Sequence, residues 1–181
     1  MTQGSASPPV QVEIRRLTED DAQDFYTLRL EALEREPNAF GQSPEEHRAM
    51  TVETIARRLG AGSGDRSFVL GAIANDRLVG IAGFYQEEGA KSRHKGRIWG
   101  VYVTEAWRGK GIARVLLSEV IERARAKPEL EQLSLAVAAG QHSAKRLYES
   151  LGFEVYGREP RAIKLENNHI DEELMVLRLG R

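Results

Sequence analysis

The sequence contains no cysteine. Disulfide bonds, cysteine-ligated zinc, iron–sulfur centres and cysteine nucleophiles are therefore excluded. A surplus of charge is also missing, because 26 lysines and arginines oppose 27 aspartates and glutamates, for a formal net charge of −1. This balance argues against a broad electrostatic footprint for DNA or RNA. A cysteine-free chain suits the reducing cytoplasm, where we expect this protein.

Long hydrophobic runs are absent as well. No stretch approaches the roughly 18 apolar residues that a membrane-spanning helix requires, so no membrane partner is expected. Residues 1–9 are small and polar, and they lack the basic and apolar segments of a secretory signal. We expect them to be a flexible tail. Residues 10–181 are enough for a single domain with its own hydrophobic core.

The sequence also lacks pairs of metal-binding side chains at the spacing that a metal site requires. The four histidines, His47, His94, His142 and His169, are scattered along the chain. No H-E-x-x-H pattern joins any two of them, and no cysteine could complete a set. The sequence therefore predicts no metal site.

Strand and helix patterns alternate along the remaining chain. Strands are expected at 10–17, 67–74, 78–85, 97–104, 133–137, 153–156, 162–165 and 173–179, and helices at 18–36, 44–59, 111–126 and 143–151. Short links between the three strands of 67–104 indicate an antiparallel meander. Because strands and helices interleave, the class is α/β with a mixed sheet.

A glycine-containing loop lies between the strand at 97–104 and an amphipathic helix. Glycines let backbone N–H groups approach a ligand closely, and a helix N-terminus adds unpaired N–H groups and a positive dipole. Arg108, Lys110 and Arg114 add positive charge. The segment predicts a phosphate or pyrophosphate site, although a tight strand–helix turn with solvated basic residues is the alternative.

Two common nucleotide-binding motifs are missing from this loop. Neither G-x-x-x-x-G-K-[ST] nor G-x-G-x-x-G is present. The loop also lies past the midpoint of the chain, after a meander rather than in a first strand–helix unit. These points count against a nucleotide-binding protein, which stays open as an alternative hypothesis.

Two sequence motifs in the second half of the chain resemble one known family. Arg108-Gly-Lys-Gly-Ile-Ala113 fits [QR]-x-x-G-x-[GA], and residues 141–153 resemble N-x-x-A-x-x-L-Y-x-x-x-G-F. In this order they resemble the GNAT superfamily of N-acetyltransferases, most sharply from 99 to 153. The resemblance implies the GNAT acyl-CoA N-acyltransferase fold. That fold is a mixed, mostly antiparallel sheet of about six to seven strands flanked by about four helices.

The same resemblance implies acetyl-CoA as co-substrate. Its pyrophosphate would lie on backbone N–H groups of 108–114, and its pantetheine would lie beside the strand at 101–103. A strand N–H would stabilise the developing oxyanion. Gln141 stands where the family often has asparagine, and glutamine keeps the amide but places it about one methylene farther out. The expected cofactor-binding residues are Val101, Tyr102, Val103, Arg108, Gly109, Lys110, Gly111, Ile112, Ala113, Arg114, Gln141 and Tyr148.

The implied reaction is direct attack of a primary amine on the thioester, with Tyr148 as general acid for the CoA thiolate. The spacing of Ala144, Leu147, Tyr148 and Leu151 also fits one apolar helix face, so a core tyrosine is the alternative. A second alternative is a catalytically inactive acyl-CoA-binding sensor or regulatory module. Tyr148 favours the enzyme, because a sensor has no use for thiolate protonation.

The proton acceptor and the amine are less well defined. Some members of the family carry a glutamate base where this chain has Arg97, so Glu31, Glu87 or a water chain could accept the proton. Phe40 and Tyr85 are candidate walls of the acceptor pocket, with a core position as the alternative for each. The acceptor is expected to be a small-molecule amine or a protein amine, and family analogy suggests a homodimer.

Overall fold

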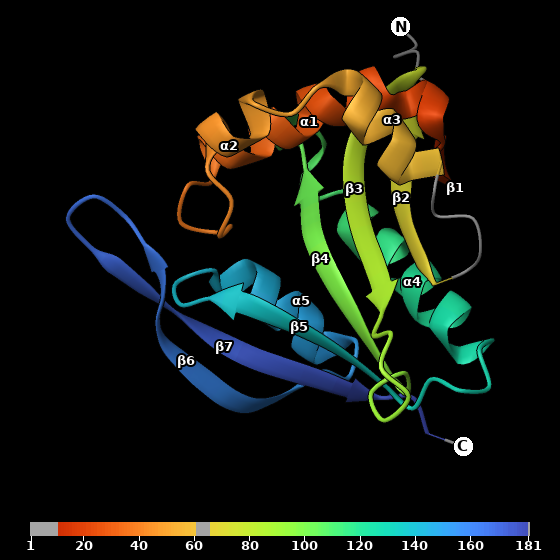
Figure 1. Ribbon diagram of the computed structural model, residues 1–181, viewed down its shortest axis with the longest axis vertical. Coiled ribbons are helices and arrows are strands. Elements are labelled where there is room, and N and C mark those ends of the chain that lie inside the picture. Colours follow the sequence, from red (N-terminus) through yellow and green to blue (C-terminus); the bar gives the residue numbers. More distant parts are fainter. Residues whose placement is uncertain (1–10, 61–65, 181) are drawn as a thin grey trace, which may run out of the picture.

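A single mixed sheet of seven strands, in the order β1-β2-β3-β4-β5-β7-β6, forms the framework (Figure 1). The computed structural model describes residues 11–60 and 66–180, so the tail expected at 1–9 lies outside the described residues. The strands are β1 (Val12–Arg16), β2 (Ser67–Ala74), β3 (Arg77–Gln86), β4 (Lys95–Val103), β5 (Gln132–Ala138), β6 (Glu154–Lys164) and β7 (His169–Arg178). The helices are α1 (Ala22–Arg35), α2 (Pro44–Arg48), α3 (Val52–Gly60), α4 (Ile112–Arg125) and α5 (His142–Ser150), with the 3-10 turns η1 (Glu19–Asp21) and η2 (Glu105–Trp107).

Strands β2 to β4 form the antiparallel meander that the sequence predicts, and β1 pairs antiparallel with β2 at its edge. The link between β2 and β3 is a two-residue turn in which Asn75 and Asp76 have φ of 50° and 58°. Asparagine and aspartate tolerate this left-handed conformation, which suits the right-handed twist of a hairpin. The predicted turn is therefore confirmed, together with the register that it sets.

Strands β4 and β5 are parallel and pair over only three residues. Lys95, Gly96 and Arg97 of β4 face residues 132–134 of β5. Beyond this point the two strands diverge, which Figure 1 shows as a widening gap towards the carboxyl end of β4. The sheet therefore splits into two wings, one centred on β3 and the other on β7.

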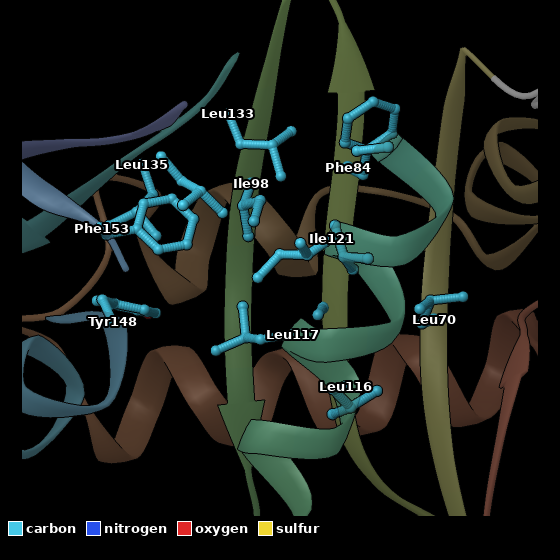
Figure 2. Packing of buried hydrophobic residues seen from close by; sticks show 14 of the residues in the cluster. Leu70, Phe84, Ile98, Leu116, Leu117, Ile121, Leu133, Leu135, Tyr148 and Phe153 are labelled. Atoms are coloured by element: carbon cyan, nitrogen blue, oxygen red, sulfur yellow. The ribbon is translucent and has the colours of Figure 1, made fainter. Parts of the chain in front are cut away.

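Two apolar layers hold the helices on opposite faces of the sheet. Leu116 and Leu117 of α4 pack with Phe84 of β3 on one face (Figure 2). On the other face, Leu28 of α1 belongs to a second cluster with Ile81 of β3. Strand residues alternate between the two clusters because successive side chains of a strand point to opposite faces.

The predicted capping box of Thr18 and Asp21 is present, but it begins the 3-10 turn η1, and α1 follows from Ala22. The backbone N–H of Thr18 donates to Oδ2 of Asp21 at 2.8 Å, as in a capping box. Arg15 of β1 adds a second partner, with Nη2 lying 2.7 Å from Oδ1 of Asp21. The carboxylate thus ties the end of β1 to the beginning of α1.

Two predicted elements differ from the structure. The helix expected at 44–59 is broken into α2 and α3, because the side chain of Thr51 accepts a hydrogen bond from Thr54 N–H and starts a new helix. The strands expected at 153–156 and 162–165 are one strand, β6, paired with β7. This long strand bends at register shifts, near Arg161 with its φ of 57°. Within the described ranges, no helix is long and apolar enough to cross a membrane.

Candidate active site

The divergence of β4 and β5 opens a cavity of about 430 Å³. Its walls are residues 98–103 of β4 and 135–138 of β5, closed on one side by the loop before α4 and on another by α5. The loop after α1 contributes Ala39 and Phe40. The cavity therefore reaches from the α4 side of the sheet to the α1 side through the gap between the two strands.

Most residues predicted as cofactor-binding meet in this cavity. Those that line it are Val101, Tyr102, Val103, Arg108, Gly109, Gly111, Ile112, Ala113, Arg114, Gln141 and Tyr148, together with the acceptor candidate Phe40. Lys110 is not among the lining residues. Tyr85 is not either, because it lies on β3 opposite Arg97, where the sheet is closed, with its side chain 37% exposed.

Strand β4 carries an irregularity where it borders the cavity. Trp99 faces Gly83, and Tyr102 faces Ile81, so β4 uses one residue more than β3 over this span. Gly100 lies inside the irregularity with a φ of 64°, which glycine adopts without strain. A bulge of this kind leaves backbone groups outside the ladder. In this position, they border the cavity.

The glycine loop has the backbone shape of an anion cradle. Gly109 and Gly111 have φ of 74° and 78°, and a Cβ built on either would meet nothing within 4 Å. Glycine is therefore needed for backbone conformation rather than for lack of space. Gly111 is the N-cap of α4, whose first turn carries no acidic residue. The open N–H groups of this turn and the helix dipole fit a phosphate group.

Each of the three basic side chains near the cradle has a protein contact. Arg108 donates from Nε to the carbonyl of Val103 at 2.9 Å. Lys110 places Nζ 4.6 Å from the centre of the Trp107 ring. Arg114 donates to Ser150 at 2.7 Å, which joins α4 to α5. The backbone N–H groups of the loop and of the first turn of α4 can donate to a phosphate beside these side chains.

Tyr148 lies on α5 with its side chain turned into the molecule. It is buried, and its ring meets that of Phe153 edge-on at 6.1 Å (Figure 2). Burial raises the pKa of its hydroxyl to about 12. Its hydroxyl makes no hydrogen bond to any residue of 11–60 or 66–180. Tyr148 therefore belongs to the core by its ring and presents a protonated, unengaged hydroxyl at the cavity.

The two carboxylates considered as bases lie outside the cavity. Glu31 accepts hydrogen bonds from the hydroxyls of Tyr102 at 2.9 Å and Thr104 at 2.6 Å. Burial, followed by the contact with Glu31, raises the pKa of the Tyr102 hydroxyl to about 12. Glu87 lies 3.6 Å from Arg97, at the closed end of β4. Neither carboxylate lines the cavity.

Two lining residues had no signal in the sequence. Glu36 lies at the end of α1 and pairs with Arg108 at 2.9 Å. Trp99 is 36% exposed, and any side chain at Gly83 of the neighbouring strand would collide with its ring. Both residues reach the cavity through tertiary contacts between distant segments. Among the described residues, no group of three His, Cys, Asp or Glu side chains could hold a metal ion.

A split sheet with a glycine cradle at the mouth of the split defines an acyl-CoA N-acyltransferase fold. The chain matches the sequence model of the Acetyltransferase (GNAT) family over residues 18–153. This match covers most of the chain. The chain therefore belongs to the GNAT family of acetyltransferases, as the two motifs predicted.

Two relatives of known name are similar to parts of the chain. One is the mycothiol acetyltransferase of Brachybacterium faecium, 31% identical over 121 residues. The other is the L-methionine sulfoximine/L-methionine sulfone acetyltransferase of Pseudomonas aeruginosa, 37% identical over 79 residues. The matches cover 67% and 44% of this chain. They span 36% and 45% of the relatives' own lengths, less than half of each.

Solved structures share the fold over nearly the whole chain. A GNAT-family acetyltransferase from Streptococcus pneumoniae superposes with a TM-score of 0.85 at 25% identity, covering 93% of this chain and 99% of that one. A Salmonella typhimurium protein solved with its cofactor acetyl-CoA has a TM-score of 0.82 at 23% identity, with coverages of 94% and 95%. The fold expected from the sequence, a mixed and mostly antiparallel α/β sheet flanked by helices, is confirmed.

Proposed function

We propose that this protein is an acetyl-CoA-dependent N-acetyltransferase that moves an acetyl group to a primary amine. One observation carries the proposal: a single cavity joins the cradle at Gly109 and Gly111, the unpaired edge of β4, and the hydroxyl of Tyr148. These are the three groups that a thioester of a phosphorylated carrier needs. The chain's membership of the GNAT family supports the same reaction.

The binding mode follows from unpaired backbone groups. The pyrophosphate lies on the N–H groups of the loop and first turn of α4, where the helix dipole favours negative charge. The pantetheine occupies the gap where β5 leaves β4 after Arg97, and its amides pair with the free edge of residues 98–103 as a short extra strand would. The Salmonella typhimurium neighbour, solved with acetyl-CoA, supports this ligand for the fold.

The reaction is a direct acyl transfer. The nitrogen of a neutral amine forms a bond to the acetyl carbonyl carbon, and the carbon–sulfur bond then breaks with its electron pair left on sulfur. A backbone N–H beside the bulge at Gly100 donates to the carbonyl oxygen as it gains negative charge. The amine nitrogen loses a proton to water or to a base reached through water.

Tyr148 is the candidate general acid for the departing sulfur. Its hydroxyl is protonated and free of other partners, so it can donate to the thiolate. The thiolate of a thiol with a pKa near 8.5 is a weaker base than the phenolate that Tyr148 would become. The hydroxyl therefore acts first as a hydrogen-bond donor that lowers the energy of the thiolate. Proton transfer from this hydroxyl to the thiolate is uphill, so it is completed by reprotonation of the Tyr148 phenolate from water.

The acceptor lies on the α1 side of the cavity, with Phe40 as one wall. The two named relatives act on different acceptors by their names. Acceptor identity therefore does not transfer from them, and a small-molecule or protein amine fits equally. Cytoplasmic location and a homodimer remain predictions. The alternative, an acyl-CoA sensor without turnover, stays open because β4 carries Arg97 where some members of the family have a glutamate base.

Two measurements test the proposal. Calorimetric titration should give micromolar binding of acetyl-CoA, on the order of −8 kcal/mol, in preference to ATP and NAD. A thiol-reactive dye should then report release of CoA when a panel of primary amines is added. Binding of ATP without binding of acetyl-CoA would overturn the ligand assignment. Tight acetyl-CoA binding without CoA release from any amine would favour the sensor.

A further inference from the structure

Arg29 of α1 carries a buried positive charge with no counter-charge. The residue is 7% exposed, and no carboxylate of the described segments lies within ion-pair distance of it. Nη2 donates one long hydrogen bond, 3.4 Å, to Gln42. Nη1 is fully buried and has no partner. A buried ion left unpaired costs several kcal/mol of stability. A ligand of opposite charge that pairs with the guanidinium would offset this cost.

The unpaired guanidinium lies behind the α1 side of the cavity wall, next to two of its lining residues, and is not itself one of them. Its Cζ lies 4.6 Å above the centre of the Phe40 ring. Nη1 lies 3.5 Å from the point that a Cβ on Gly100 would occupy. Both Phe40 and Gly100 line the cavity. The charge is therefore directed at the bulge of β4. Helix α1, which carries Arg29, lies on the face of the sheet opposite α4 (Figure 1).

Neighbouring titratable groups do not neutralise this charge. Glu31 of the same helix accepts hydrogen bonds from Tyr102 and Thr104. Glu36 is paired with Arg108. His47 is neutral or positive in either protonation state and cannot neutralise Arg29; burial, and also the charge of Arg29, lowers the pKa of His47. Glu31 and Glu36 thus each have another partner, and the guanidinium of Arg29 is available to a ligand.

We propose that Arg29 binds a carboxylate of the acceptor, and that the acceptor is a free α-amino acid. This inference rests on the proposed function, because it assigns the substrate class of the same site. The planar guanidinium holds a carboxylate through two parallel N–H groups, one of them the unpaired Nη1. The carboxylate replaces the long hydrogen bond of Gln42, which lies on the loop between α1 and α2.

Distance along the substrate favours an α-amino acid over a longer amine. The carboxylate on Arg29 would lie beside Gly100, and the acetyl carbonyl is expected at the backbone N–H groups of the same bulge. An amine that attacks there must be close to its own carboxylate. In an α-amino acid the two groups are separated by one carbon atom. The N-terminus of a protein has no free carboxylate at that position.

Thermal stability separates this proposal from a purely structural role for Arg29, which predicts that loss of the guanidinium lowers the midpoint of thermal unfolding. Replacing a buried, unpaired charge by an apolar side chain of similar length is neutral or stabilising. Arg29→Met should therefore keep the midpoint of thermal unfolding or raise it. Arg35→Met on the same helix is the matched control, because the Arg35 side chain is 59% exposed and pairs with Glu105 on the surface.

The test compares acceptors that differ only in the carboxylate. Acetyl transfer to the twenty protein amino acids is measured beside their α-carboxamides, with the wild-type chain, Arg29→Met, Arg29→Lys and Arg35→Met. The wild type should prefer the best amino acid over its amide by roughly 10²-fold in kcat/KM. Arg29→Met should lose that preference, with KM for acetyl-CoA unchanged. Arg29→Lys should retain part of it, and Arg35→Met all of it.

The outcomes separate this inference from the proposed function. Equal use of amides and amino acids by the wild type overturns the inference while acetyl transfer stands. Retention of the preference in folded Arg29→Met overturns it as well. If no amine is acetylated, calorimetry with the same amino acids decides. Binding that is lost in Arg29→Met supports the carboxylate site although the enzyme assignment fails, and no binding overturns both.

Discussion

Arg108 and Glu36 form an ion pair of 2.9 Å that ties the loop before α4 to the end of α1. The same guanidinium donates to the carbonyl of Val103, at the last residue of β4. The first basic residue of the motif therefore joins three segments that border the cavity. Its side chain is held by these two contacts within the protein.

We predict that Arg108→Met acts on stability more than on cofactor binding. Loss of the ion pair and of the hydrogen bond should cost about 1–2 kcal/mol, at the low end because the side chain is partly exposed. KM for acetyl-CoA should change by less than about threefold. Urea unfolding and steady-state kinetics measure the two effects. A tenfold rise in KM at unchanged stability would show direct contact with the cofactor.

The cradle is tested by a matched pair at Gly111. Asparagine and aspartate have the same shape and both tolerate a positive φ, so Gly111→Asn and Gly111→Asp share the same backbone strain of about 1 kcal/mol. Only the aspartate places a negative charge beside the pyrophosphate. Calorimetry should show that the Asp variant binds acetyl-CoA at least about tenfold more weakly than the Asn variant. Equal affinities would place the phosphate site elsewhere.

Tyr148→Phe removes one hydroxyl from the cavity and keeps the ring. Because the hydroxyl has no partner in the described chain, thermal stability should change by less than about 0.5 kcal/mol. If the hydroxyl assists the leaving thiolate, kcat should fall by about 10- to 100-fold while KM for acetyl-CoA holds. Wild-type kcat and KM in the variant would make Tyr148 a core residue only.

The pH profile gives a second test of Tyr148. Its pKa of about 12 keeps the hydroxyl protonated throughout the range in which the enzyme is assayed. Ionisation of Tyr148 should therefore cause no decline of the wild-type kcat between pH 8 and pH 10, and the profiles of the wild type and of Tyr148→Phe should have the same shape in this range. A decline in this range that disappears in the variant would mean that the hydroxyl ionises far below the expected pKa.

Asp21 predicts how stability depends on pH. The hydrogen bond from Arg15, followed by that from Thr18, lowers the pKa of Asp21. The carboxylate therefore stabilises the fold above its unfolded pKa of about 3.9, and this contribution is lost as pH falls through the lower folded value. Asp21→Asn should cost about 1–2 kcal/mol at pH 7. The difference should shrink below about pH 4.

The exposed neighbour Asp20 supplies the control for this experiment. Asp20→Asn changes charge in the same turn without removing the contact with Arg15, so its effect should stay within about 0.5 kcal/mol. Urea unfolding at a series of pH values compares the two variants. A cost of Asp21→Asn that persists unchanged to the lowest pH would mean that the ionised carboxylate contributes nothing.

Local signals determined much of this protein from its sequence. The strand at 67–74 and the helix at 111–126 matched the structure closely, because each carries a regular apolar period and is bounded by turn or capping residues. The capping box of Thr18 and Asp21 was readable for the same reason. The glycine loop was readable because a positive φ requires glycine at Gly109 and Gly111, whatever lies around them.

Local signals were insufficient to predict secondary structure where a contact between two segments determines it. The break between α2 and α3 depends on a hydrogen bond from Thr54 N–H to Thr51, in a stretch whose apolar period continues across the break. The long strand β6 is held together by pairing with β7, and its polar middle section has no period of its own. In both cases the intrinsic free energies of the competing conformations differ by less than the free energy that the tertiary contacts contribute.

The features of the candidate site also fall into those that the sequence predicts and those that tertiary contacts determine. The motifs determined which segments border the cavity, because loop shape and helix start are local properties. The direction of each side chain was decided only by tertiary structure. Arg108 points to Glu36 because α1 ends beside it, Tyr85 lies away from the cavity because the sheet is closed at its position, and Arg29 is unpaired because Glu31 is engaged by β4 and the residue after it. Those outcomes depend on contacts between segments far apart in the chain, which no local pattern encodes.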